Sequence, residues 1–255
     1  LGNANGSDNF KKADFLIEDC CQALGTEING KKVGSFGDLS IFSFQETKHI
    51  TTLGEGGMIC SNNEELIDII AGIRNHAEFY SGKKFLGGNF RMTEIQAAFG
   101  IVQLKKINKI LKQFRSNAKY VIKNLPSEII PPHTPSNVNN SFLVIGCLYN
   151  EKEIGVSRTK FLEKLTKNRN HILKKDKKSD IKGINMKSGK LISTGYSSPL
   201  YEIPVYKKFK PKNGCPNAKK FTETSLWMDI HKFRSRSEIN EELEILTKTI
   251  NQFKK

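Results

Sequence analysis

Residues 43–50 read Ser43-Phe44-Gln45-Glu46-Thr47-Lys48-His49-Ile50, and a glycine-rich segment, Gly54-Glu55-Gly56-Gly57, follows shortly after. The apolar run Leu39–Phe44 predicts one strand, and Gly57–Cys60 predicts a second. Glycines between two strands indicate backbone that turns tightly or approaches a ligand closely. We therefore expect two strands joined by a compact loop that presents Lys48.

Another strand is expected upstream of this pair. Phe15-Leu16-Ile17 reads as a short buried strand that ends at Glu18-Asp19. In open α/β sheets, ligands gather at the carboxyl ends of the strands. Asp19 and Lys48 both follow such an end, so both lie where a ligand is expected.

A lysine, an acid and a hydroxyl grouped in this way point to a pyridoxal phosphate (PLP) site. There a lysine forms an imine with the cofactor aldehyde, and an acid keeps the pyridine nitrogen protonated. Lys48 and Asp19 are the candidates for these roles, which are the catalytic ones. Gln22 could hydrogen-bond the phenolic oxygen of the cofactor, and Ser43 could donate to its phosphate. Each residue also has a plainer interpretation: a surface lysine, an acid that caps a turn, an ordinary surface amide and a hydroxyl satisfied within the sheet.

Helix signals follow the strands. Asn62 or Asn63 can cap one helix. Thr93-Glu94-Ile95-Gln96 resembles a capping box, and the apolar pattern after it predicts one long helix that continues to Phe114. Asn89 lies close to the start of this second helix, where anions are favoured. A contact between Asn89 and a phosphate is therefore expected, the alternative being a residue of a simple turn.

Prolines mark a boundary in the middle of the chain. The segment Pro126–Pro135 interrupts any helix, so we expect two domains, residues 1–125 and residues 126–255. In the second domain, Phe142–Leu148 reads as a core strand. The last helix is expected from about Ser237 to Phe253, because its apolar residues follow a helical spacing.

Composition limits the function classes. The 255 residues include 41 Lys and Arg against 26 Asp and Glu, a net charge of +15. Seven of the basic residues are Arg, which indicates lysines spread over solvated faces rather than a nucleic-acid surface. The five cysteines and five histidines show neither Cys-x-x-Cys nor metal-ligand spacing, so no disulfide framework and no metal site are expected. Short apolar runs and unpaired cysteines favour a cytoplasmic protein without membrane insertion.

Residues 15–110 resemble the DegT/DnrJ/EryC1/StrS family of PLP-dependent sugar aminotransferases. Each matching segment is weak by itself, but their order and spacing together are specific. A fainter resemblance continues to the end of the chain. The matching segments are, in order, Ile17–Gly25, Gly34–Asp38, Ser43–Lys48, Gly54–Gly57, Arg74–His76 and Asn89–Ala98.

The resemblance implies an α/β fold of the aspartate-aminotransferase type (fold type I) and a homodimer with cofactor sites at the subunit interface. Residues 1–125 would then be the C-terminal part of the large PLP-binding domain, and residues 126–255 a small α+β domain. It assigns Lys48, Asp19, Gln22 and Ser43 the roles given above. Asn89 would reach the phosphate of the neighbouring subunit's cofactor.

The implied reaction transfers an amino group from glutamate or glutamine to a keto group of a nucleotide-linked sugar, in the synthesis of surface polysaccharide or related glycoconjugates. Family members have a long N-terminal part before the strand at Phe15, so we expect this chain to lack that part and to bind the cofactor weakly. The lysine-rich segment 174–190 matches nothing and reads as an exposed loop.

Two alternatives stay open. PLP-dependent sugar dehydratases of the same family replace the lysine by histidine, and His49 is adjacent, although Lys48 itself is present. A non-catalytic member that keeps the fold for binding, or has no activity, is the other alternative. Retention of Lys48, Asp19 and Gln22 together argues against it.

Overall fold

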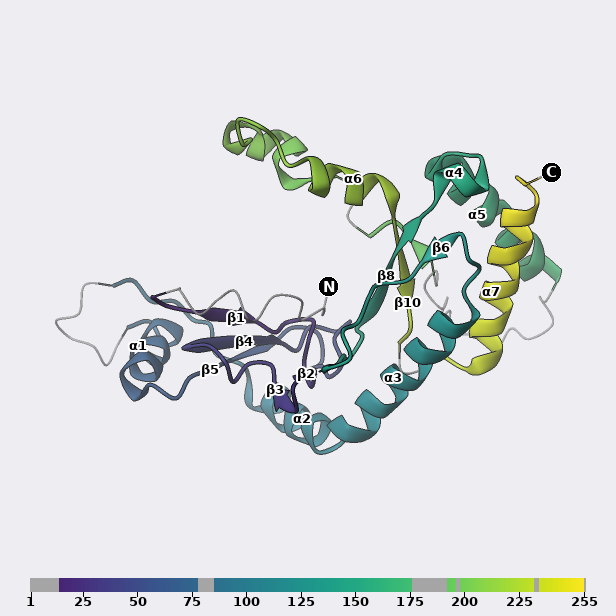
Figure 1. The fold of residues 1–255 in the computed structure, drawn as a ribbon. Coiled ribbons are helices and arrows are strands. Elements are labelled where there is room, and N and C mark those ends of the chain that lie inside the picture. Colours follow the sequence, from purple (N-terminus) through teal and green to yellow (C-terminus); the bar gives the residue numbers. More distant parts are fainter. Residues whose placement is uncertain (1–13, 78–84, 176–191, 196–197, 232–233, 255) are drawn as a thin grey trace. The chain divides into compact units, whose positions relative to one another are not determined.

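The computed structural model divides into two compact units, each described by itself (Figure 1). The residues that it describes are 14–77, 85–175, 192–195, 198–231 and 234–254. Unit 1 comprises residues 1–115 and 134–143, and unit 2 comprises residues 116–133 and 144–255. The domains expected at residues 1–125 and 126–255 stay a prediction. Most of the loop expected at 174–190 lies outside the described residues.

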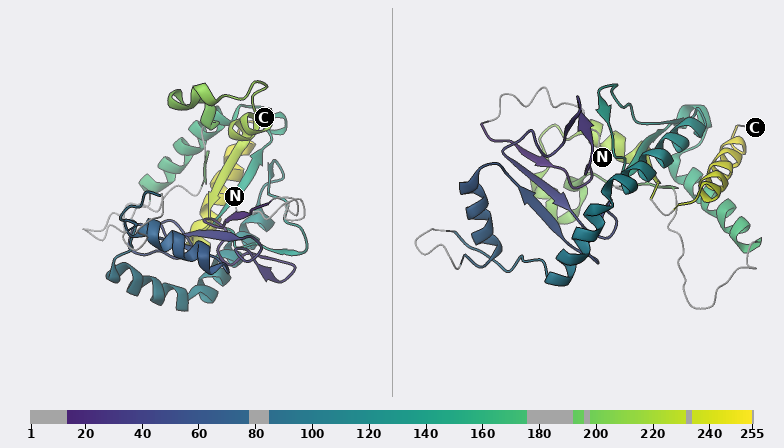
Figure 2. Two further views of the ribbon diagram at one scale, coloured as in Figure 1. Left: turned by 90° about the vertical axis from the view of Figure 1, so that its left-hand side faces the viewer. Right: turned by 90° about the horizontal axis from the view of Figure 1, so that it is seen from below.

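Unit 1 contains a three-stranded sheet in the order β1-β4-β5. The strands are β1 (Ile17–Asp19), β4 (Leu39–Ser43) and β5 (Gly57–Cys60), and Figure 2 shows them side by side. β1 runs parallel to β4, whereas β5 is antiparallel to it. All three predicted strands are therefore confirmed.

The burial expected for the first strand is wrong. Ile17 is 55% exposed and Phe15, just before the strand, is 47% exposed. Met58 and Ile59 of β5 are exposed as well. Because β1 pairs with β4 alone among the described strands, the described residues leave its apolar side chains open. An apolar run predicts a strand, but it does not say what covers that strand.

A smaller sheet of unit 1 joins segments that are far apart in the sequence. It contains β2 (Glu27–Ile28), β3 (Lys31–Lys32) and β7 (Val138–Asn139), all antiparallel. The buried hydroxyl of Thr26 lies 2.9 Å from the hydroxyl of Ser141. These contacts attach residues 134–143 to the segment that follows β1.

The helix predicted to run through to Phe114 is broken into two. α1 (Glu64–Arg74) is capped by Asn63, and α2 (Glu94–Lys105) begins with the predicted capping box, so both starts are confirmed. α2 ends at Lys105, because the backbone angles of the next residue, Lys106 (φ −95°, ψ 0°), are not helical, and α3 (Ile107–Asn124) follows. The break separates α2, which has no buried residue, from α3, in which Phe114 is completely buried.

Unit 2 is built on a four-stranded antiparallel sheet in the order β6-β8-β10-β9. The strands are β6 (Ile129–Ile130), β8 (Val144–Tyr149), β10 (Ser225–Asp229) and β9 (Ile192–Ser193). β8 begins two residues later than predicted, because Phe142 has a positive φ of 51° that a strand cannot continue. The core of the sheet includes Ile145, Leu226 and Met228, all fully buried.

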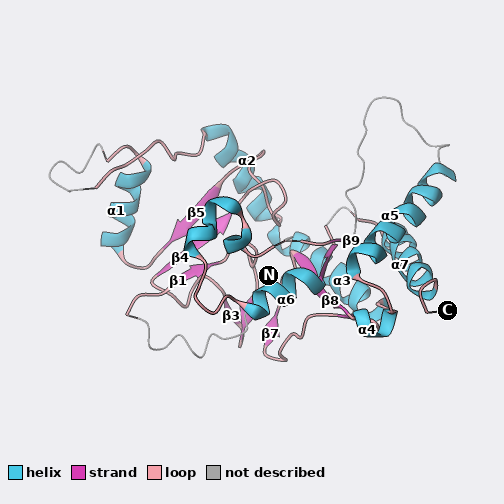
Figure 3. Cartoon of the chain, turned by 90° about the horizontal axis from the view of Figure 1, so that it is seen from above, coloured by secondary structure: helices cyan, strands magenta, loops and turns pink. Residues whose placement is uncertain are grey.

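Helices complete unit 2. They are α4 (Glu151–Ile154), α5 (Arg158–Lys175), α6 (Pro216–Thr224) and α7 (Arg236–Asn251), with 3₁₀ turns η2 (Leu200–Glu202) and η3 (Pro204–Phe209). α5 and α7 lie side by side (Figures 1 and 3). An ion pair of 2.5 Å between Arg169 and Glu242 joins them. The predicted C-terminal helix is thus confirmed, and Ile239, Leu243 and Leu246 form part of its buried stripe.

Candidate active site

The candidate site begins at the carboxyl ends of two parallel strands in unit 1. Asp19 is the last residue of β1 and Ser43 is the last residue of β4. Because parallel strands end at the same edge of a sheet, both side chains start from one edge. Gln22 is half-buried in the turn after β1. The amide of Cys20 ties this turn to β4 by donating to the carbonyl oxygen of Ile41 at 2.9 Å.

Lys48 lies in the loop between β4 and β5, and hydrogen bonds within the loop close it. The Lys48 amide donates to the carbonyl oxygen of Gln45 at 2.9 Å, and the Thr52 amide donates to that of Phe44 at 3.0 Å. A Cβ atom on Gly56 would lie 2.1 Å from the Thr52 hydroxyl oxygen, so the loop has no space for a side chain there. The tight glycine loop predicted from the sequence is confirmed.

The residues after Lys48 fix its backbone. His49 is 1% exposed and Ile50 is 2% exposed. The imidazole ring of His49 meets the ring of Phe114 edge-on, with 4.8 Å between the centroids. Lys48 itself is half-buried. Its side chain therefore leaves a backbone that is held both by the loop and by a buried neighbour.

Cys21 lies beside Asp19 and contacts the neighbouring strand β4. The Cys21 amide donates to Asp19 Oδ1 at 3.1 Å, and its thiol lies 3.9 Å from the carbonyl oxygen of Ile41 in β4. The pKa of Cys21 is raised to about 11, first by burial and then by the hydrogen bond and charge of Asp19, while the charge of Lys48 acts to lower it. The thiol therefore stays protonated at neutral pH.

Sequence reasoning missed the role of Glu18. Its carboxylate accepts hydrogen bonds from the backbone amides of Gly34 (2.6 Å), Phe36 (2.6 Å) and Gly37 (2.7 Å). A Cβ atom on Gly37 would lie 2.7 Å from the carbonyl oxygen of Leu16. Glu18 thus fastens the segment 34–37 against β1, directly beside Asp19. The signal in the sequence was an acid followed by closely spaced glycines.

Ser43 and Asn89, the two residues predicted to bind phosphate, share no hydrogen bond in the part of the chain that the structure describes. The Ser43 hydroxyl accepts a hydrogen bond from the Gln45 amide at 3.3 Å, so its own proton points elsewhere. Asn89 is exposed and forms an antiparallel bridge with Asn75 after α1. Its Oδ1 accepts from the Arg91 guanidinium at 3.0 Å, which orients the amide NH₂ as its donor side. Among the described residues, the structure does not tie Asn89 to Lys48.

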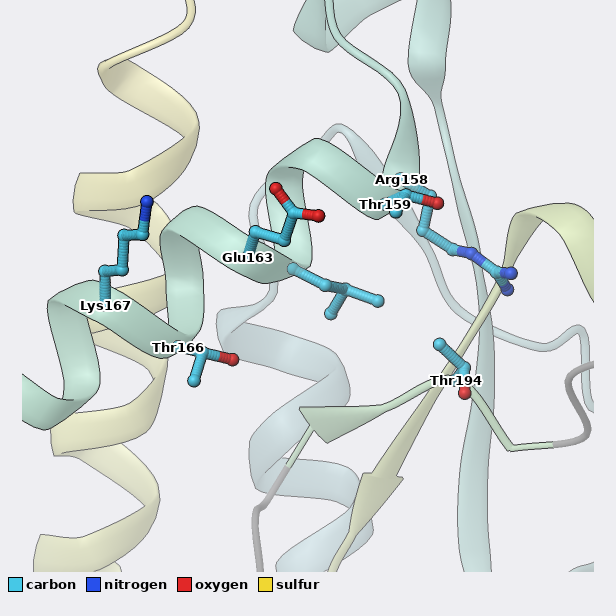
Figure 4. Close-up of a pocket in the computed structure, with 7 residues that line it drawn as sticks. Arg158, Thr159, Glu163, Thr166, Lys167 and Thr194 are labelled. Atoms are coloured by element: carbon cyan, nitrogen blue, oxygen red, sulfur yellow. The ribbon is translucent and has the colours of Figure 1, made fainter.

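A pocket of about 460 Å³ lies in unit 2, apart from these residues (Figure 4). The lining residues are Arg158, Thr159, Leu162, Glu163, Thr166 and Lys167 of α5, with Thr194. The Arg158 guanidinium donates to the carbonyl oxygen of Ser225 at 2.8 Å, so its charge serves a structural contact. This pocket contains none of the residues predicted for the candidate site.

Two further properties concern the described part of the chain alone. No three His, Cys, Asp or Glu side chains are grouped there as a metal site would require. None of the helices described combines the length and the apolar character of a membrane span.

Known proteins resemble this chain in sequence and in structure. The sequence profile of the DegT/DnrJ/EryC1/StrS aminotransferase family matches residues 11–174. The GDP-perosamine synthase of Vibrio cholerae is 42% identical over 127 residues, which are 48% of this chain and 34% of that protein. The chain thus spans about a third of the length of this curated relative.

Solved structures match over nearly the whole chain. Helicobacter pylori PseC, an aminotransferase involved in the biosynthesis of pseudoaminic acid, matches with a TM-score of 0.74 and 26% identity over 94% of this chain and 60% of that one. The putative sugar aminotransferase Spr1654 from Streptococcus pneumoniae, in its PLP form, matches with a TM-score of 0.72 and 22% identity over 94% and 58%. These matches confirm the expected α/β fold of the aspartate-aminotransferase type.

The residues present fit the cofactor of these aminotransferases, which is PLP. A lysine amine suits its aldehyde, a carboxylate suits its pyridine nitrogen, and a hydroxyl suits its phosphate. With a profile match over residues 11–174, the chain belongs to the DegT/DnrJ/EryC1/StrS aminotransferase family.

Proposed function

We propose that this protein is a PLP-dependent aminotransferase that moves an amino group from glutamate or glutamine to a keto group of a nucleotide-linked sugar. The observation that carries the proposal is that Asp19 and Ser43 end the parallel strands β1 and β4 at one edge of the sheet, and that the closed loop after β4 carries Lys48. Two groups of opposite charge at one strand edge are the minimum that this cofactor chemistry needs.

The substrate class follows from the relatives. The Vibrio cholerae relative is named GDP-perosamine synthase, and PseC is described as an aminotransferase of pseudoaminic acid biosynthesis. Both names refer to sugar metabolism. A nucleotide-linked keto sugar, used for surface polysaccharide or a related glycoconjugate, is therefore the substrate proposed here.

The proposed roles follow the chemistry of each side chain. PLP, when bound, supplies an electron sink at the carbon that carries the amino group. Lys48 binds the cofactor covalently and, once released, moves the proton at the reacting carbon. Asp19 holds a proton on the pyridine nitrogen, and Gln22 donates to the phenolic oxygen. Ser43 and Asn89 bind phosphate, the latter on the neighbouring subunit's cofactor.

A homodimer is part of the proposal. α2 has no buried residue, although it carries several apolar side chains. Ile95 is 75% exposed, Ile101 56% and Leu104 55%. Exposed apolar side chains gathered on one helix are typical of a contact with another surface. A second copy of the chain would cover them, and the cytoplasm is the compartment proposed for the dimer.

A second candidate function is binding without catalysis on the same fold. The exposure of Asp19 favours it, because an acid in contact with water holds a pyridine proton less firmly than one in a dry site. The two candidates differ in whether PLP becomes attached to Lys48.

The deciding experiment is a PLP titration of the full chain. It is followed by visible absorbance, borohydride reduction and peptide mapping. We expect reduced cofactor on Lys48 and none in Lys48→Ala. Lys31→Ala, at an exposed position of β3, is the matched control and should retain the adduct. If folded wild-type chain carries no adduct on Lys48, the catalytic proposal fails and the second candidate stands.

Activity is tested separately. Chain that carries PLP is incubated with glutamate or glutamine and a panel of nucleotide-linked keto sugars. Mass spectrometry then follows the amino sugar and the keto acid. Products from the amino donor alone, without amination of any sugar, would keep the aminotransferase chemistry and overturn the proposed substrate class.

A further inference from the structure

The first turn of α2 is attached to the loop that presents Lys48. Gln96, the third residue of the helix, donates from its Nε2 to the carbonyl oxygen of Glu55 at 3.1 Å. Its Oε1 accepts from the amide and from the hydroxyl of Thr93, both at 3.0 Å. One side chain therefore closes the capping box of α2 and binds the loop.

A second contact between α2 and the loop lies one turn further along the helix. Thr52 is 1% exposed, and its hydroxyl donates to the same carbonyl oxygen of Glu55 at 2.9 Å. A Cβ atom on Gly100 would lie 2.9 Å from Cγ2 of Thr52, so the helix approaches Thr52 closely. The Thr52 amide in turn closes the base of the Lys48 loop by donating to the carbonyl oxygen of Phe44 at 3.0 Å. The helix thus contacts the residue on which the loop closes.

The turn between Thr52 and Glu55 is strained. Leu53 has a positive φ of 65° and is 58% exposed. Such a φ is costly for a bulky residue and persists only where the surroundings hold it. An exposed leucine has little burial of its own to offset that cost, so the hydrogen bonds from Thr52 and Gln96 to the Glu55 carbonyl oxygen hold the turn in this form.

We propose that Gln96 is a positioning residue, which holds the Lys48 loop against α2 and so sets the place from which the lysine amine reaches PLP. This inference rests on the proposed function. Gln96 acts through Glu55 and Thr52, not on the reacting atoms.

Gln96→Glu separates the two roles of this side chain. A glutamate keeps the oxygen that closes the capping box, where Glu and Gln both serve, but it has no N–H to donate to Glu55. Helix stability should therefore be kept while the contact with the loop is lost. Gln96→Met, of similar length, removes both roles without adding a charge. Gln103→Glu makes the same chemical change about two turns further along α2 and is the matched control.

The first test needs no cofactor. Hydrogen exchange of the Thr52 amide follows the free energy of local opening at the base of the loop. The loss of one hydrogen bond should speed it roughly twofold to tenfold in both Gln96→Glu and Gln96→Met, and Gln103→Glu should leave it unchanged. In thermal unfolding, Gln96→Glu should match wild type, whereas Gln96→Met should fall below it. Exchange at Thr52 that stays at the wild-type rate in both Gln96 variants would overturn the proposal.

Leu53→Asn provides a rescue. Asparagine tolerates a positive φ better than leucine does, so adding it to Gln96→Glu should restore part of the slow exchange at Thr52. No recovery would overturn the strained turn as the link between Gln96 and the loop.

The second test uses chain loaded with PLP, whose attachment to Lys48 is followed by visible absorbance and borohydride reduction. Gln96→Glu and Gln96→Met should each weaken attachment roughly twofold to tenfold. The absorbance should also titrate at a different pH in both variants, because the lysine amine is held less firmly. Gln103→Glu should match wild type in both properties, so an effect shared by the two Gln96 variants belongs to the lost donor and not to the added charge.

The outcomes separate the two proposals. If wild-type chain places no PLP on Lys48, the proposed function fails, and the exchange at Thr52 still decides whether Gln96 holds the loop. If wild-type chain binds PLP and both Gln96 variants match it in affinity and in pH dependence, the positioning role alone is wrong.

Discussion

Replacing Glu18 should loosen the segment beside Asp19 more than replacing any ordinary surface acid. The carboxylate accepts three backbone amides, those of Gly34, Phe36 and Gly37, at 2.6–2.7 Å. Glu18→Ala removes all three acceptors at once. The segment then has no internal substitute, because backbone amides cannot satisfy one another.

The size of the effect follows from the exposure of each amide. A hydrogen bond to a charged group contributes about 1.5–3 kcal/mol where water is excluded. The Phe36 bond is exposed, so water replaces it at little cost. The bonds of Gly34 and Gly37 are part-buried, and about 1–1.5 kcal/mol each is reasonable, which gives about 2–3 kcal/mol together. Glu18→Gln keeps one oxygen and should lose about half of that.

Hydrogen exchange measures this locally. The loss corresponds to roughly 30- to 150-fold faster exchange of the Gly34 and Gly37 amides, because exchange follows the free energy of local opening. Glu65→Gln, on the exposed side of α1, is the control and should leave these amides unchanged. Unchanged exchange in Glu18→Ala would refute the reasoning, since it would mean that the three short contacts contribute nothing to the order of the segment.

Three further changes test individual contacts, each within one of the two units. Arg169→Met leaves the carboxylate of Glu242 (16% exposed) without its partner and should lower the free energy of unfolding, measured in urea, by about 3 kcal/mol. Adding Glu242→Leu should recover much of this loss, and a double variant whose loss is the sum of the two single losses would contradict the pairing. Hydrogen bonds from the backbone and the hydroxyl of Ser235, the cap of α7, hold the pKa of Glu238 below its ordinary 4.5, so the stabilisation from its charge is present above pH 4.5 and is lost as pH falls below that value. Glu238→Gln should therefore lower the free energy of unfolding by about 1 kcal/mol at pH 7 and by little at pH 3, and an equal loss at both pH values would disprove the charge effect. Gly56→Ala should destabilise the Lys48 loop by about 1–3 kcal/mol, because the added methyl group would lie 2.1 Å from the Thr52 hydroxyl oxygen. The rate of proteolysis in the loop measures this, and a rate no faster than in wild type would show that the loop has room for the methyl group.

The sequence predicted helix starts, strands and the glycine loop well, because the residues that mark them, such as a capping side chain or a glycine, act on the backbone next to them. The capping box at Thr93 fixed the start of α2, and Asn63 capped α1 as one of two candidates. Strands β4 and β5 followed from apolar runs bounded by glycines. The loop of Lys48 was predictable because closely spaced glycines have few uses other than tight backbone.

Other features depend on contacts that one sequence does not display. The break at Lys106 involves no proline or glycine, so no residue type in the sequence marks it. The exposure of Ile17 depends on what lies over the sheet. The three amides held by Glu18 lie 16 to 19 residues further along the chain, and spacing alone does not show that they meet its carboxylate.

α3 has a consequence for how the chain can be divided. Its 18 residues, Ile107–Asn124, cross from unit 1 to unit 2 between Arg115 and Ser116, and the chain crosses again on either side of residues 134–143. A cut at 115/116 would leave each half-helix shorter than the ~12–15 residues that an isolated helix needs in water. A cut at 125/126 would keep α3 whole but remove β7 from its partner β2. No single break therefore yields two intact pieces, and separate expression of either unit would require circular permutation or a grafted strand.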